Sequence, residues 1–141
     1  MPIQFPPDRG EILICDFSGL LFHEMEKTRP VIVLSPKISS RAKLTTVVCL
    51  STTEPSIKED YHLEITFDPP YSPKFLSSTM WLKGDIIYSL NIDRMTRPHI
   101  KDEAGKRTYP IRKIDRDLML KVERCVLNGI GLKVDRVPEI L

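Results

Sequence analysis

Short apolar runs separated by turn-forming residues recur along most of this chain, and they favour a fold built mainly of strands. The runs are rich in Val, Ile and Thr, which pack well on the pleated surface of a sheet. We expect strands at residues 11–17, 30–34, 45–51, 62–67, 80–82 and 85–90, and a hairpin whose tip lies at residues 102–105. Such short, closely spaced runs predict an antiparallel sheet.

Only one segment has the spacing of an amphipathic helix, and it lies in the C-terminal part of the chain. Its apolar residues, at i, i+4, i+7 and i+8, are Leu118, Val122, Cys125 and Val126. Asp115 and Asp117 stand at its start, where the helix dipole favours negative charge, and Gly129 favours its end. The pattern therefore predicts a mainly β fold, a β-barrel with a C-terminal helix that can cover its open end.

The length of 141 residues suits a single domain spanning residues 1–141. A domain of this size buries enough surface to fold without disulfides or metal ions. Its three cysteines, Cys15, Cys49 and Cys125, lack metal-ligand spacing, so we expect free thiols and no metal site. No leader-like start and no apolar stretch long enough to span a bilayer are present, so we expect a cytoplasmic protein outside the membrane.

Positive and negative charges nearly balance, with a formal net charge of +2, so the molecule as a whole does not attract polyanions strongly. Basic residues nevertheless outnumber acidic ones between residues 94 and 124. This local excess is a weak indication of a polyanionic partner.

Familiar catalytic motifs such as GxSxG, HExxH and the P-loop are absent from the sequence, so the candidates are polar residues at the ends of expected strands. Arg29 precedes Pro30, which restricts it to extended backbone and aims its guanidinium from a fixed point. That group could bind a phosphate or pair with Glu24 or Glu26 on the surface. Thr52, at the end of the third expected strand, could donate to a phosphate or cap the following turn.

Other reactive residue types are better explained by packing. The histidines, His23, His62 and His99, occur in separate contexts that suggest no catalytic triad. Trp81 and Tyr88 suit the core or a subunit interface, and Cys15 and Cys49 lie within apolar strands as small buried hydrophobic residues.

Several segments resemble, in order and spacing, the MazF/PemK toxins of bacterial toxin–antitoxin pairs. They are Arg9-Gly-Glu-Ile-Leu-Ile-Cys-Asp-Phe17, Glu24, Thr28-Arg-Pro-Val-Ile-Val-Leu-Ser-Pro36 and residues 47–53. The likeness is most specific over residues 9–55 and continues more weakly to the final helix. The chain departs from the family in the loop at residues 18–28, which carries Leu20, Leu21, Phe22 and Met25, and in the proline-rich stretch at residues 69–73. It departs also in the hairpin around Gly105, which lengthens the path to the last helix.

The resemblance implies an SH3-like barrel of the MazF/PemK/CcdB type that forms a homodimer and cleaves single-stranded RNA, commonly mRNA, at short sequence motifs. It implies no metal or other cofactor, and a separate antitoxin protein that neutralises the toxin. In the family, the residues matching Arg29 and Thr52 are the catalytic pair, and those matching Asp16 and Glu24 lie at the RNA groove. Attack by a ribose 2′-hydroxyl on the adjacent phosphate would then be assisted by donors from Arg29 and Thr52.

Two other functions are alternatives, because a fold does not determine a function. One is a CcdB-like toxin that binds and poisons a protein target such as DNA gyrase without catalysis. The other is an SH3-like interaction module that uses the basic stretch at residues 94–124 as its binding face. Cleavage of RNA by the purified protein would separate the enzyme from both.

Overall fold

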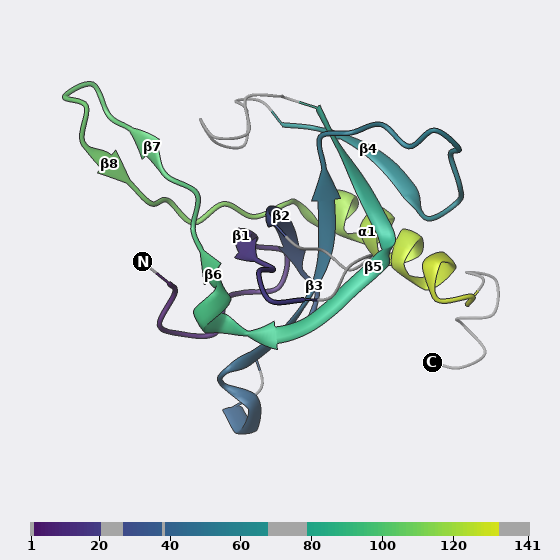
Figure 1. Cartoon of the computed structure of the whole chain (residues 1–141), viewed down its shortest axis with the longest axis horizontal. Helices are drawn as coiled ribbons and strands as arrows, with labels where there is room; N and C mark the ends of the chain where they lie inside the picture. The colour runs from purple at the N-terminus through teal and green to yellow at the C-terminus, as the bar shows by residue number, and fades with distance from the viewer. Residues whose placement is uncertain (1, 21–26, 38, 68–78, 133–141) are drawn as a thin grey trace.

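A curled antiparallel sheet with one helix packed against it forms the body of the protein in the computed structural model, which describes residues 2–20, 27–37, 39–67 and 79–132 (Figure 1). Within these residues the main sheet has six strands in the order β4-β5-β3-β2-β1-β6, and all neighbours pair antiparallel. The strands are β1 (Ile12–Asp16), β2 (Thr28–Val33), β3 (Leu44–Ser51), β4 (His62–Thr66), β5 (Thr79–Asn91) and β6 (Met95–Thr96).

The remaining elements are short, apart from the helix. β7 (Ile100–Lys101) and β8 (Arg107–Thr108) form a separate hairpin, as expected, and α1 (Arg116–Gly129) is the predicted helix. Two 3-10 turns, η1 (Ser39–Arg41) and η2 (Ile92–Arg94), complete the described structure. The expected fold class, mainly β with a C-terminal helix, is therefore confirmed.

Residues on the two faces of the sheet form two separate cores. The inner core, which lies inside the curl, contains Ile3, Leu13, Cys15, Phe17, Val31, Val33, Val47, Cys49, Ile92 and Met95. The helix-side core contains Ile12, Ile32, Val48, Leu50, Ile65, Phe67, Met80, Leu82, Met119, Val122 and Cys125. Because the central strands are buried on both faces, they read as continuous apolar runs in the sequence.

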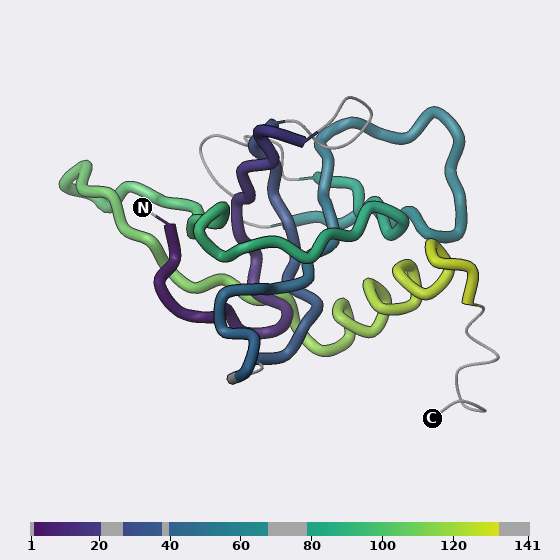
Figure 2. The backbone as a smooth tube through the Cα atoms, turned by 60° about the horizontal axis from the view of Figure 1, so that its bottom comes forward, coloured from purple at the N-terminus to yellow at the C-terminus, as the bar shows by residue number. Residues whose placement is uncertain are grey.

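The curl arises because β5 continues through η2 into β6, which pairs with the far side of β1. In Figure 2 this green segment crosses in front of the purple and blue strands, and α1 runs along another side. The helix thus packs on a face of the sheet, through the helix-side core, and does not cover an open end of the barrel as the sequence suggested.

β5 corrects one prediction, because the two strands expected at residues 80–82 and 85–90 are a single strand of 13 residues. Its pairing with β3 shifts between Val48, which faces Ile87, and Cys49, which faces Lys83. The intervening residues, Gly84, Asp85 and Ile86, therefore form a bulge within β5, and Lys83-Gly84 is not a turn.

The bulge lets β5 and α1 approach closely through two glycines. A Cβ atom on Gly84 would lie 2.6 Å from the carbonyl oxygen of Cys125, and one on Gly129 would lie 2.6 Å from the carbonyl oxygen of Gly84. At the other end of α1, Asp115 accepts a 2.8 Å hydrogen bond from the backbone N–H of Leu118, which makes it the N-cap. No helix in the described part of the chain is long and apolar enough to cross a membrane.

Candidate functional site

Three of the four residues singled out from the sequence lie at one end of the sheet. Asp16 is the last residue of β1, Arg29 is the second residue of β2, and Thr52 directly follows β3. The strand pairing explains why they lie together. In the β1–β2 ladder, Asp16 pairs with Thr28, the neighbour of Arg29. In the β2–β3 ladder, the pair nearest to this end of the sheet is Val31 with Cys49, so the residues that follow Cys49 lie beside those that precede Val31. We call this end the strand-end rim, and it comprises Asp16, Thr28, Arg29, Ser51 and Thr52.

Arg29 is half-buried and lies above the inner core. It stands directly opposite Cys15 in the β1–β2 ladder. Burial raises the pKa of the Cys49 thiol to about 12, and the nearby charge of Arg29 acts in the opposite direction. Arg29 therefore lies opposite one buried cysteine and within electrostatic reach of another, and the residue keeps partial access to solvent.

The three cysteines are free and buried, as predicted. Burial raises the pKa of the Cys15 thiol to about 12, as it does for Cys49, and it also raises the pKa of Cys125. Thiols with such raised pKa values stay protonated near neutral pH, so they are inert packing groups and not nucleophiles.

Thr52 is exposed at the corner of the turn that follows β3. The hydroxyl oxygen of Ser51 accepts a 3.1 Å hydrogen bond from the N–H of Thr53. The side chain that stabilises this turn is therefore that of Ser51, and not that of Thr52, which the sequence suggested as a possible cap. The antiparallel pairing places Thr52 at the end of β3 beside the start of β2, where Arg29 lies, and its exposure leaves it accessible to a ligand.

Asp16 is exposed, and a second arginine fixes the backbone around it. Its carboxylate accepts a 2.9 Å hydrogen bond from the N–H of Ser18. One nitrogen of Arg94 donates to the carbonyl oxygens of Asp16, at 3.0 Å, and Ser18, at 2.8 Å. Arg94 was not singled out from the sequence, where its only signal was its position at the start of the basic stretch.

Glu24, the fourth residue, lies outside the described residues, and so do His23, Glu26 and the prolines at 69–73. Of the other histidines, His62 accepts the N–H of Glu59 at 3.0 Å through Nδ1, and the ring of His99 lies beside that of Tyr109. These contacts agree with the packing roles that the sequence suggested for histidine.

The basic stretch at residues 94–124 does not form one surface. Arg94 braces the rim, Arg97 pairs with Glu11, and Lys113 pairs with Asp8. Other basic residues of the stretch are spread over the β7–β8 hairpin and α1, and they include Lys101, Lys106, Arg107, Lys121 and Arg124. The alternative of an SH3-like interaction module required this stretch to form a single binding face, so it loses its main support.

The chemistry of the strand-end rim is that of an anion site. Arg29 offers a planar, permanently charged fork of N–H donors, and Thr52 adds a hydroxyl donor. Such donors match the oxygens of a phosphate. Among the residues that the structure describes, no group of three or more His, Cys, Asp or Glu side chains is placed to hold a metal ion.

Comparison with known families gives one match that spans most of the chain. A family model described as the PemK-like, MazF-like toxin of type II toxin–antitoxin systems matches residues 8–129. The chain is also 29% identical over 150 residues to YifN, an uncharacterised protein of Escherichia coli K12, with coverage of 93% of this chain and 96% of that protein.

Solved structures share the fold at lower sequence identity. MazF from Deinococcus radiodurans superposes with a TM-score of 0.59 at 16% identity, covering 92% of this chain and 100% of that one. An endoribonuclease from Mycobacterial species, in complex with its cognate antitoxin, gives a TM-score of 0.57 at 19% identity, covering 89% of this chain and 96% of that one. These likenesses confirm the expected barrel fold.

Proposed function

Because this chain belongs to the PemK-like, MazF-like toxin family of type II toxin–antitoxin systems, we propose that it is an endoribonuclease that cuts single-stranded RNA at the strand-end rim. The observation that carries the proposal is the placement of Arg29 and an exposed Thr52 at the same end of neighbouring strands. Two solved structures of the same fold are endoribonucleases from Mycobacterial species, which supports this assignment.

The reaction is a transfer within the RNA chain. The 2′-oxygen of one ribose bonds to the adjacent phosphorus, the bond from phosphorus to the 5′-oxygen of the next nucleotide breaks, and that oxygen takes up a proton. The 2′-hydroxyl loses its proton in exchange, so the products are a 2′,3′-cyclic phosphate and a 5′-hydroxyl. Single-stranded RNA is required because the sugar and phosphate must rotate into line for this attack.

Arg29 has the central role in this scheme. The phosphate gains negative charge as the 2′-oxygen approaches, and a fixed guanidinium stabilises that charge most in the transition state. A guanidinium stays protonated at any ordinary pH, so Arg29 acts as a charge stabiliser and hydrogen-bond donor and not as the resting base. Since Arg29 supplies the positive charge, we expect cleavage to proceed with divalent metals chelated.

The other residues have supporting roles in the proposal. The Thr52 hydroxyl donates a hydrogen bond to a non-bridging phosphate oxygen. Asp16 and Glu24 contact the bound RNA. Arg94 is a positioning residue, because its two hydrogen bonds fix the backbone of Asp16 and Ser18. We assign all of this to one domain spanning residues 1–141.

The proposal extends to partners and place of action. A cognate antitoxin covers the RNA groove, as supported by the solved endoribonuclease bound to its own antitoxin. The toxin acts on mRNA in the cytoplasm as a homodimer. The family match does not favour the CcdB-like poisoning of a protein target.

The test is incubation of the purified protein with a long single-stranded RNA in EDTA, followed by mapping of the fragment ends. We expect discrete cuts that leave cyclic phosphates and 5′-hydroxyls, and no cut where the attacking nucleotide is replaced by its 2′-deoxy form. An intact RNA in the presence of folded protein would overturn the proposal. Fragments with 5′-phosphates would overturn the mechanism.

A further inference from the structure

A hairpin arm, residues 99–111, projects from the body of the protein around β7 and β8 (Figure 1). Residues 100–111 are all exposed, so the described body covers neither face of the arm. Two-stranded hairpins of this kind are only marginally stable in water on their own. The arm therefore needs an anchor at its root and has two faces free for a ligand.

The anchor is Glu11, which is only 1% exposed. Its carboxylate accepts the Nε–H of Arg97 at 2.8 Å and the backbone N–H of Asp8 at 3.1 Å. Glu11 also forms a backbone bridge with Lys113, so both strands of the arm's root meet at this residue. A buried, hydrogen-bonded ion pair at the root holds the arm in one direction.

One face of the arm carries two facing pairs of like groups. Lys101 lies directly opposite Arg107 in the β7–β8 ladder. Two positions toward the root, the rings of His99 and Tyr109 lie 6.0 Å apart between centroids. Side chains two residues apart in a strand share a face, so the cations and the rings are neighbours.

The facing cations are a source of repulsion in the free protein. Like charges directly opposite each other destabilise a hairpin. The nearest acid, Asp102, has its Oδ1 atom engaged by the N–H groups of Ala104 and Lys106, both at 2.9 Å, within the turn. Among the described residues, neither Lys101 nor Arg107 forms an ion pair. An anion bound between these two side chains would remove the repulsion.

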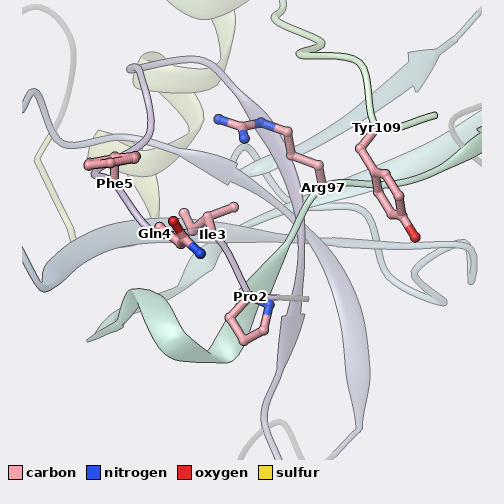
Figure 3. Close-up of a pocket in the computed structure, with 6 residues that line it drawn as sticks. All are labelled: Pro2, Ile3, Gln4, Phe5, Arg97 and Tyr109. Carbon is pink, nitrogen blue, oxygen red and sulfur yellow. The ribbon is translucent and has the colours of Figure 1, made fainter.

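A hollow of about 380 Å³ is bordered by Tyr109 of the arm and by the N-terminal segment (Figure 3). It is lined by Pro2, Ile3, Gln4, Phe5, Arg97 and Tyr109. Tyr109 thus belongs both to the ring pair and to the wall of the hollow. The hollow combines apolar surface with the amide of Gln4 and the guanidinium of Arg97, a mixture that suits the faces and edges of a nucleobase.

We propose that this face of the arm and the adjoining hollow bind nucleotides of the RNA substrate at a distance from the cleaved phosphate. The proposal rests on the proposed function for the identity of the RNA. Lys101 and Arg107 bind a phosphate, and the ring of Tyr109, against which the His99 ring is tilted by 58°, stacks on a base about 7 Å away along the strand. Single-stranded RNA fits because it alternates charged phosphates with flat bases, whereas an acidic peptide uses the cations and leaves the ring pair without a role.

The first test measures binding separately from cleavage. The probe is a fluorescent 2′-O-methyl RNA of about 20 nucleotides, longer than the ~4–16 that a small domain occupies, and it cannot be cut by 2′-hydroxyl attack. The double variant Lys101→Ala and Arg107→Ala should bind it roughly tenfold more weakly, with the slope of log affinity against log salt reduced by about 0.7, the value for one phosphate of a single strand. The matched control, Lys121→Ala with Arg124→Ala on exposed positions of α1, should keep the wild-type slope.

The second test concerns the ring. Tyr109→Ala should weaken binding of the same probe roughly tenfold, because a lost base stack is worth a factor of that order. Tyr109→Phe keeps the ring and should bind as the wild type does. Circular dichroism of each variant checks that the body of the protein is unchanged.

Other outcomes would overturn the proposal. If the arm variants bind the RNA probe as tightly as the wild type, the arm is not an RNA-contact surface. If they lose binding to a polyglutamate probe while they retain the RNA, the arm serves an acidic protein segment instead.

Cleavage kinetics distinguish failure of this proposal from failure of the proposed function. With an RNA of about five nucleotides around the cut, too short to reach beyond one small binding site, the arm variants should match the wild type. With a long RNA they should show a raised KM and an unchanged kcat. A wild-type protein that binds RNA but never cuts it would refute the proposed function alone.

Discussion

β3 carries two opposite kinds of surface within a few residues. Leu50 is fully buried in the helix-side core, whereas Thr52, two residues later, is exposed at the strand-end rim. The first residue contributes apolar area that packing removes from water, and such area is the main stabilising term in folding. The second contributes almost nothing to that term.

Stability and activity therefore depend on different parts of the same strands. The two cores hold the strands in register, and the register fixes where the strand ends carry Asp16, Arg29 and Thr52. Changes at the rim should therefore alter cleavage with little change in the free energy of unfolding. Changes in the helix-side core should do the reverse.

Apart from the loss of Arg29 itself, the largest effect is expected for Thr52→Val, which removes a hydroxyl and keeps the shape of the side chain. The cleavage rate should fall by about 10²–10³-fold, the usual result of losing one oriented donor to a transition state. The free energy of unfolding should stay within about 0.5 kcal/mol of the wild type. Thr52→Ser retains the hydroxyl and should retain most activity, and equal rates for the Val and Ser variants would remove Thr52 from the site.

Gly84→Ala tests the packing of the sheet against α1, which should affect stability and not activity. The added Cβ would lie 2.6 Å from the carbonyl oxygen of Cys125 and 2.7 Å from that of Tyr61, so β5 and α1 must separate. We expect a loss of about 1–3 kcal/mol in urea unfolding, typical of overpacking, and a nearly unchanged rate for the folded fraction. Asp85→Asn, at the exposed neighbouring position, is the control and should change stability little.

Arg94→Ala probes the contact that positions the backbone of the strand-end rim. Without its guanidinium, the carbonyl oxygens of Asp16 and Ser18 lose their donor, and the segment after β1 becomes less well positioned. We expect a roughly tenfold fall in cleavage rate with a small change in stability, because only positioning is lost. An Arg94→Ala enzyme with wild-type kinetics would show that the rim needs no such brace.

The smallest effect is expected at Asp8, which lies outside both regions. Hydrogen bonds from Lys113 and Lys37 lower its pKa from 3.8 to about 2. A carboxylate with a lowered folded-state pKa adds stability above its unfolded pKa and loses that contribution as the pH falls through the folded value. Asp8→Asn should therefore be slightly less stable than the wild type at pH 5–7, and the difference should disappear as the pH falls from about 4 to about 2. A difference that persists at low pH would contradict the ion-pair explanation.

Most strands could be predicted from the sequence because each depends on local signals. β1 to β4 have alternating or continuous apolar residues bounded by turn formers, and Asp115 marked the start of α1. β5 was divided wrongly because Gly84 reads as a turn residue locally. Its true role depends on the close approach of Cys125 in α1, a contact that no local pattern shows.

The candidate site was predictable only in part. Arg29 and Thr52 could be identified as polar strand ends, but their meeting at one rim depends on the strand order of the whole sheet. Arg94 could not be found in this way, because its hydrogen bond to the carbonyl of Asp16 spans 78 residues of sequence. The like-charged pair on the arm likewise becomes visible only once the register of Lys101 and Arg107 is known.

The separation of activity from stability is tested most directly by Arg29→Ala, with the RNA cleavage rate and the urea unfolding midpoint measured on the same preparation. We expect a rate at least about 10²-fold lower and a free energy of unfolding within about 1 kcal/mol of the wild type. Cleavage at the wild-type rate would contradict the assignment of Arg29. Loss of cleavage together with loss of the folded state would contradict the separation itself.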